Sequence, residues 1–135
     1  MPKNLLTVAE ALDNVFLEIF QKNKKVIMLG LGVNDPKKIF STTTKVCQKF
    51  PKRIFDVPIS ENSISGIAIG CSMNNLVPIL THQRLDFSLL TLDQIINQAA
   101  KWYYMFDGKK NIPIVIRLIV GRGWGQGPQH SQLSL

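Results

Sequence analysis

Apolar residues recur along two stretches of the chain with the spacing of an α-helix. Near the N-terminus, Thr7 and Glu10 form a T-x-x-E capping box. The apolar positions that follow share one helical face, which predicts a helix over residues 8–21: Val8, Leu12, Val15, Phe16 and Ile19. A second stripe predicts a helix over residues 88–106 that ends at Asp107–Gly108; its members are Leu92, Ile95, Ile96, Ala99, Tyr103 and Phe106.

Short runs of β-branched and aromatic residues predict strands over residues 26–29, 53–57, 77–81 and 112–120. Helical segments over residues 41–50 and from Glu61 onward separate them, so the order is α-β-α-β-α-β-α-β. This alternation predicts an α/β fold with three layers, in which helices cover both faces of a mainly parallel sheet. The chain stops at Leu135, just after a glycine-rich loop. We therefore expect one domain over residues 1–135, with a sheet that lacks its last helix–strand unit.

The composition is that of a globular protein. The 135 residues suffice for one domain with a modest core, and 45% of them are hydrophobic. The longest apolar runs have the length of a strand, and the N-terminus lacks the apolar core of a secretory signal, so we expect neither a membrane span nor export. Cys47 and Cys71 lack the spacing of metal ligands and are expected to be free thiols. These features favour a cytoplasmic location.

The net charge of +7 admits two interpretations. A basic protein attracts acidic partners or nucleic acid. A lysine-rich, solvated surface is the favoured interpretation, because most lysines lie in the first 52 residues at predicted helix ends and loops, without aromatic residues between them. The sequence carries no nucleic-acid-binding motif, so a nucleic-acid partner is not expected.

Chemically capable side chains follow the predicted strands. Glu61 comes after the second strand, the segment His82–Phe87 after the third, and His130 after the fourth. Residues just beyond the carboxyl ends of strands line the ligand crevice of an open α/β sheet. An acid and an aromatic in one crevice, Glu61 and Phe87, would hold a cofactor ring at its edge and on its face. The alternative for Glu61 is a carboxylate that interacts with the dipole of its own helix, and the two interpretations have equal weight.

A lone histidine is more often structural, whereas two at one rim, His82 and His130, shift the balance modestly toward acid–base or anion-binding work. No third ligand accompanies them, so no metal site is predicted. Gly66 and Gly70 share one helical face and would let another helix approach closely, either within the chain or across a subunit interface. Each glycine costs a helix about 1 kcal/mol relative to alanine, which points to a packing reason. The glycine-rich loop lacks the signature of a Walker or dinucleotide-binding loop.

Four segments resemble the β subunit of the thiamin-diphosphate-dependent 2-oxo acid dehydrogenases, a family that includes pyruvate dehydrogenase and shares this domain with transketolase. They are KRIFDVPISENSISGIAIG, DFSLLTLDQIINQAAKWYYM, PIVIRL and QHSQ. The resemblance implies a pyrimidine-binding domain. Glu61 would hydrogen-bond the aminopyrimidine and drive the tautomer that deprotonates the thiazolium carbon. Phe87 would stack on the ring, and Ile59 and Gln83 would also contact the cofactor. His130 would face the substrate or the incoming lipoyl group.

The chain also departs from the family pattern. Leu31 and Gly32 stand where the family commonly has acids linked to proton traffic between paired active sites. His82 and Arg84 replace more apolar residues, which suggests a different or more anionic substrate.

The G-D-G…N motif that holds magnesium and the diphosphate is also missing. The resemblance therefore implies an α subunit that supplies both, in a homo- or hetero-oligomer, and this chain alone is expected to be inactive. The alternative is a shortened, catalytically inactive domain that acts as an interaction module.

Overall fold

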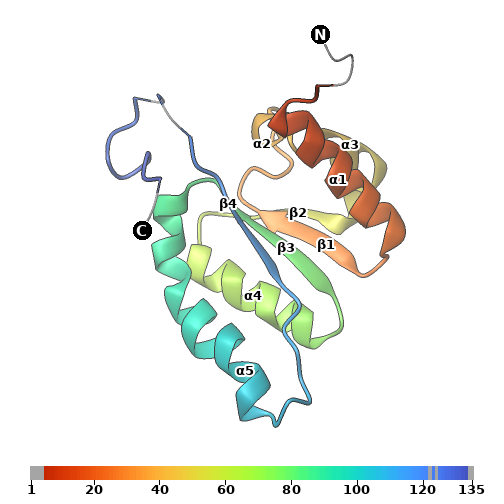
Figure 1. Ribbon diagram of the computed structural model, residues 1–135, viewed down its shortest axis with the longest axis vertical. Coiled ribbons are helices and arrows are strands. Elements are labelled where there is room, and N and C mark those ends of the chain that lie inside the picture. Colours follow the sequence, from red (N-terminus) through yellow and green to blue (C-terminus); the bar gives the residue numbers. More distant parts are fainter. Residues whose placement is uncertain (1–4, 122, 124, 134–135) are drawn as a thin grey trace.

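A computed structural model describes residues 5–121, 123 and 125–133, and within these ranges four strands form one parallel sheet (Figure 1). The strands are β1 (Val26–Gly30), β2 (Ile54–Asp56), β3 (Val77–His82) and β4 (Val115–Leu118), in the order β2-β1-β3-β4. The register aligns Met28 of the central β1 with Ile54 on one side and Ile79 on the other. The predicted α/β fold with a parallel sheet is confirmed.

The side chains of β1 alternate between two separate cores. Val26 and Met28 pack with α1 (Val8–Lys22) and α3 (Thr44–Lys49) on one face of the sheet. Ile27 and Leu29 pack on the other face against α4 (Glu61–Met73). All five residues of β1 are buried, as expected for a parallel strand covered on both faces. Helices therefore form layers on either side of the sheet, as Figure 1 shows.

The N-terminal helix begins at the predicted capping box. The backbone N–H of Glu10 donates to Thr7 Oγ1 at 3.2 Å, and that of Thr7 donates to Glu10 Oε2 at 2.8 Å. The helix predicted over residues 41–50 is shorter than expected, and hydroxyl groups do not cap it. A carboxylate of α1 does so instead, because the backbone N–H of Lys45 donates to Asp13 Oδ1 at 2.9 Å.

A single turn, α2 (Lys38–Ser41), was not predicted. Its four residues have positive φ values of 48°, 42°, 57° and 62°. Left-handed backbone costs an ordinary residue about 1–2 kcal/mol, so this turn must be held by its surroundings. One such contact comes from β4, where Arg117 Nη2 donates to Thr42 Oγ1 at 2.7 Å.

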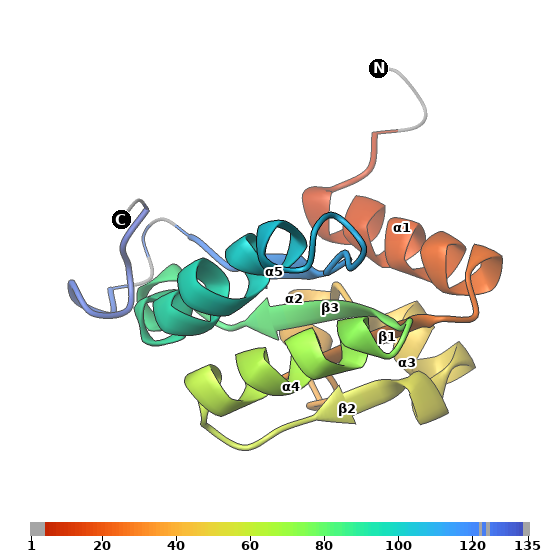
Figure 2. The same ribbon diagram turned by 90° about the horizontal axis from the view of Figure 1, so that it is seen from below.

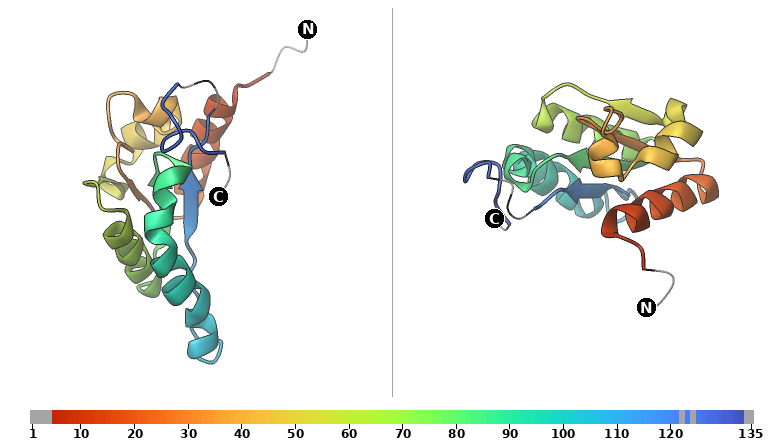
Figure 3. Two further views of the ribbon diagram at one scale, coloured as in Figure 1. Left: turned by 90° about the vertical axis from the view of Figure 1, so that its left-hand side faces the viewer. Right: turned by 90° about the horizontal axis from the view of Figure 1, so that it is seen from above.

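The helix predicted over residues 88–106 is one helical segment whose winding changes from 3₁₀ through π to α. It comprises η2 (Leu85–Thr91), the π-helical η3 (Gln94–Ala99) and α5 (Ala100–Met105). The segment runs alongside α4, and its α5 end projects beyond the sheet (Figures 2 and 3). Half or more of Ile96 and Tyr103 is exposed, so the apolar stripe is largely uncovered in the single chain. No helix in the described part of the chain is long and apolar enough to cross a bilayer.

Candidate functional site

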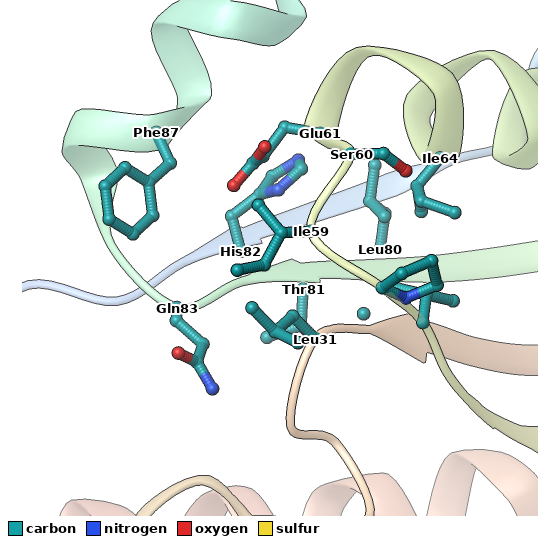
Figure 4. A pocket seen from close by; sticks show the side chains of 13 residues that line it. Leu31, Ile59, Ser60, Glu61, Ile64, Leu80, Thr81, His82, Gln83 and Phe87 are labelled. Atoms are coloured by element: carbon teal, nitrogen blue, oxygen red, sulfur yellow. The ribbon is translucent and has the colours of Figure 1, made fainter.

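A cleft opens at the carboxyl ends of β1 and β3, where the start of α4 and the turn of η2 close around it. It brings together five residues that the sequence predicted as site residues: Ile59, Glu61, His82, Gln83 and Phe87 (Figure 4). They come from the β2–α4 loop, α4, the end of β3 and η2. Their convergence follows from the parallel sheet, because the carboxyl ends of neighbouring strands meet at one edge.

Glycine shapes the wall of the cleft after β1. Gly32 has a φ of 75°, and a Cβ there would overlap Gln83 Nε2. Its backbone N–H donates to Asp56 Oδ1 at 2.7 Å, which ties the loop to the end of β2. The glycine therefore admits the Gln83 amide, which points away from Glu61 and Phe87 in Figure 4. Asp56 was not among the predicted site residues, although an acid at the carboxyl end of a strand was a usable signal.

Glu61 is the first residue of α4 and is half-buried beside an apolar floor. Leu80 and Ile64 form that floor and are 0% and 7% exposed. Ile59 stands at the rim with 76% of its surface exposed, where it is available to an incoming apolar face. The cleft thus offers one carboxyl group among apolar side chains, an arrangement that orients a mostly apolar ring through one polar edge.

His82 ends β3 and is almost fully buried, with 5% exposed. Burial lowers the pKa of its imidazole, and the nearby Glu61 carboxylate opposes this shift without cancelling it. A pKa below the ordinary 6.5 leaves the ring neutral at pH 7. His82 therefore enters the cleft as a neutral hydrogen-bonding group and not as a cation.

Phe87 and His130 meet at the open side of the cleft. Their ring centroids lie 5.3 Å apart with the planes at 89°, an edge-to-face contact. His130 is exposed and comes from the glycine-rich loop, of which Arg122 and Trp124 lie outside the described residues. His130 therefore reaches the edge of the site by its contact with Phe87, which lines the cleft.

Arg84 faces a different space from His82. It lines a neighbouring hollow of about 90 Å³ together with Phe40. Its Nε and Nη2 atoms donate to Gln126 Oε1 at 3.2 and 3.0 Å, and its guanidinium lies 6.0 Å from the Phe40 ring centroid. The two basic residues predicted on the substrate side thus line two different hollows of the described structure.

The two glycines of α4 have different neighbours. A Cβ on Gly66 would lie 3.2 Å from Gln94 Oε1, so the helical segment of the same chain approaches this position. No described atom lies within 4 Å of a Cβ placed on Gly70. The close approach at Gly66 is therefore explained within the chain, whereas a subunit contact at this face stays a prediction.

The cavity volume of the cleft is about 20 Å³, enough for one water molecule and not for an aromatic ring. A ring could enter only if the rim residues Ile59 and Phe87 moved outward. Across the described ranges, no group of three or more His, Cys, Asp or Glu side chains is placed to hold a metal ion.

Comparison with known proteins identifies the domain. The family described as "Transketolase, pyrimidine binding domain" matches residues 5–135. The mitochondrial pyruvate dehydrogenase E1 component subunit beta of Bos taurus is 39% identical and that of Rattus norvegicus 40%, each over 128 residues that cover 94% of this chain and 36% of the relative. The Arabidopsis thaliana subunit beta-1 is 36% identical over the same share of this chain and 35% of its own length. The chain spans about a third of these relatives.

A solved structure shares the architecture. "Split gene transketolase, inactive beta4 tetramer" superposes with a TM-score of 0.53 and 25% identity, over 66% of this chain and 28% of the other. The sequence match and the structural match therefore agree on one fold and confirm the resemblance carried by the P-I-S-E segment. The chain belongs to the transketolase pyrimidine-binding domain family.

Proposed function

We propose that this chain supplies the pyrimidine-binding half of a thiamin diphosphate site in a 2-oxo acid dehydrogenase of the pyruvate dehydrogenase type. The observation that carries the proposal is the convergence of Glu61 and Phe87 on one cleft from separate elements. A carboxyl at a ring edge and an aromatic on a ring face are the two contacts that an aminopyrimidine needs.

The side chains in the cleft fit the ring in chemistry. Glu61 offers the single carboxyl, and the buried Ile64 and Leu80 form an apolar floor beside it. The exposed Ile59 and the partly exposed Phe87 can move outward to make the room that the present free volume lacks. Binding would then place the ring between the apolar floor and the rim.

Thiamin diphosphate, when bound, would supply a nucleophilic thiazolium carbon for the carbonyl group of a 2-oxo acid. Glu61 holds or moves a proton at the ring edge, so it acts as a general acid–base group. Phe87 fixes the plane of the ring. His130, held edge-on against Phe87, faces the side from which a substrate or acyl acceptor arrives.

A partner completes the site in this proposal. Nothing in the sequence resembles the G-D-G…N motif, so magnesium and the diphosphate would be held by an α-type subunit. The bovine and rat relatives are named as subunits of a pyruvate dehydrogenase E1 component, which supports a multi-chain assembly. The expectation of a cytoplasmic location is untested, and these relatives are named mitochondrial.

Calorimetry tests the proposal. Thiamin diphosphate with magnesium is titrated into this chain alone, into an α-type chain carrying G-D-G…N, and into their mixture. We expect very weak binding to this chain alone and a large gain in the mixture, because most of the ligand's charge needs the metal and phosphate cradle. Micromolar binding to this chain alone would contradict the division of the site. A mixture that binds no better than the α-type chain would contradict the proposed function.

A catalytically inactive interaction module is the second candidate. The uncovered apolar side of the η2–α5 segment favours it, with Ile96, Tyr103 and Tyr104 between 51% and 89% exposed. Such a module would join an α-type chain without increasing its cofactor affinity. Size-exclusion chromatography of the calorimetry mixture separates the two candidates, since assembly without a gain in binding supports the module.

A further inference from the structure

His82 carries one of the two unused polar side-chain atoms in the described lining of the cleft, beside Thr81 Oγ1. Its Nε2 is buried and has no hydrogen-bond partner among the described residues. A buried donor or acceptor that lacks a partner is costly, so it normally has a function or an incoming partner. The same cleft contains the half-buried carboxyl of Glu61, and Figure 4 shows both groups on one side of it.

Glu61 is the charged group that acts on this imidazole. It interacts electrostatically with His82 from the first turn of α4. The other histidine, His130 of the glycine-rich loop, contacts Phe87. The Glu61 carboxyl and the His82 imidazole are therefore neighbours in a largely apolar cleft.

The other charged groups near His82 are engaged elsewhere. Arg84, two residues along the chain, donates to Gln126. Asp86 on η2 accepts the backbone N–H of Gln132 at 3.3 Å. Arg117 of β4 aligns with the residue before His82, so it faces the opposite side of the sheet. In the described part of β1, the residues that line the cleft are uncharged.

We propose that His82 is a positioning residue for Glu61: its Nε2–H donates a hydrogen bond to the Glu61 carboxylate and holds that carboxylate toward the cleft. Rotation of the half-buried glutamate side chain closes the bond. The neutral ring then carries its single proton on Nε2, which assigns the tautomer. The bond satisfies the buried Nε2 and gives the carboxylate a fixed donor in a largely apolar cleft.

The role of the His82–Glu61 hydrogen bond in catalysis rests on the proposed function. When Glu61 gives its proton to a ring nitrogen in the cleft, the carboxyl O–H bond breaks and an N–H bond forms on the ring. The carboxylate that remains keeps the hydrogen bond from His82 Nε2. Proton transfer therefore leaves a carboxylate that is hydrogen-bonded and not a bare buried charge.

Nuclear magnetic resonance on the full chain tests the pair without any cofactor. The chain has two histidines, so its imidazole spectrum has two sets of signals, and His82→Gln assigns them. We expect the His82 signals to titrate below the ordinary histidine range. In Glu61→Gln the midpoint should fall by about one further pH unit, because the opposite charge beside the imidazole is lost. Glu18→Gln, which removes an exposed carboxylate of α1, should leave the midpoint unchanged.

An unchanged midpoint of the His82 titration in Glu61→Gln would overturn the proposal whatever the function of the domain.

A second readout is the pH profile of proton exchange at the thiazolium carbon in the reconstituted complex. His82→Phe removes the donor and should move the acid limb to higher pH, whereas His82→Gln keeps an N–H donor and should restore it. Equal profiles for both variants would also overturn the proposal. If no complex forms at all, the proposed function fails, but the titration of His82 in the chain alone still tests its hydrogen bond to Glu61.

Discussion

The His130 and Phe87 rings meet edge to face, with the ring planes at 89° and the centroids 5.3 Å apart. This contact joins the glycine-rich loop after β4 to the helical turn after β3. Edge-to-face pairs of this kind contribute about 0.5–1.5 kcal/mol beyond the area they bury. The orientation of Phe87 therefore depends on a residue 43 positions further along the chain.

Phe87→Ala should weaken cofactor binding in the reconstituted complex by about tenfold or more, since it removes both the stacking face and the support of His130. The measurement is calorimetric titration of thiamin diphosphate with magnesium. Leu5→Ala is the control, because Leu5 is 82% exposed and is not among the residues that line the cleft. Equal affinity of the Phe87 variant and the control would remove Phe87 from the cofactor contact.

Glu61→Gln should reduce proton exchange at the thiazolium carbon by roughly 10²–10⁴-fold, the usual contribution of a general acid–base group. The amide retains a hydrogen bond to the ring, so cofactor affinity should change much less. Exchange followed by deuterium incorporation in the reconstituted complex measures the first effect, with Glu18→Gln as the control. Exchange as fast in the variant as in the wild type would assign the proton transfer to another group.

The convergence of Glu61 and Phe87 could be predicted from the sequence. It required only the strand assignments and the rule that parallel strands end at one edge. The alternation in β1 was equally accessible, because a strand buried on both faces is apolar throughout. These features depend on local pattern, which a single sequence carries.

The position of Arg84 could not be predicted. It follows His82 by two residues, yet its guanidinium is held by Gln126 from a loop 42 positions away. The left-handed turn at Ile39 and Phe40 has no local signal either, because neither residue prefers positive φ. In both cases long-range contacts decide the geometry and leave no periodic trace in the sequence.

Gly32→Ala should lower the free energy of unfolding by about 1–2 kcal/mol, since alanine is strained at a φ of 75° and its Cβ would overlap Gln83 Nε2. Urea unfolding followed by circular dichroism measures the change. Gly123→Ala is the matched control, because its φ of 70° is similar and no described atom lies within 4 Å of the added Cβ. A larger loss at position 123 than at position 32 would contradict the close packing of Gln83.

The stability of the chain should fall as the pH drops below about 6.5, the ordinary pKa of histidine. Burial lowers the pKa of His82 in the folded state, so the unfolded chain binds a proton at a higher pH than the folded one. Unfolding is then favoured as the pH falls through the unfolded pKa, until the folded pKa is reached. Urea midpoints between pH 8 and pH 5 measure this slope. His82→Gln should flatten it relative to the wild type, and an unchanged slope would show that other groups cause it.

Alanine substitutions at Gly70 and Gly66 should change the stability of the isolated chain by different amounts. An alanine at Gly70 meets no described atom within 4 Å and removes an unfavourable helical glycine, so the free energy of unfolding should rise by up to about 1 kcal/mol. An alanine at Gly66 would press on Gln94 and gain less. If α4 also forms a subunit contact at this face, Gly70→Ala should weaken self-association despite the added stability, because the closely approaching helix loses its space. Light scattering over a concentration series, beside urea unfolding of the same samples, measures both effects. Unchanged association of the Gly70 variant would place the subunit contact elsewhere.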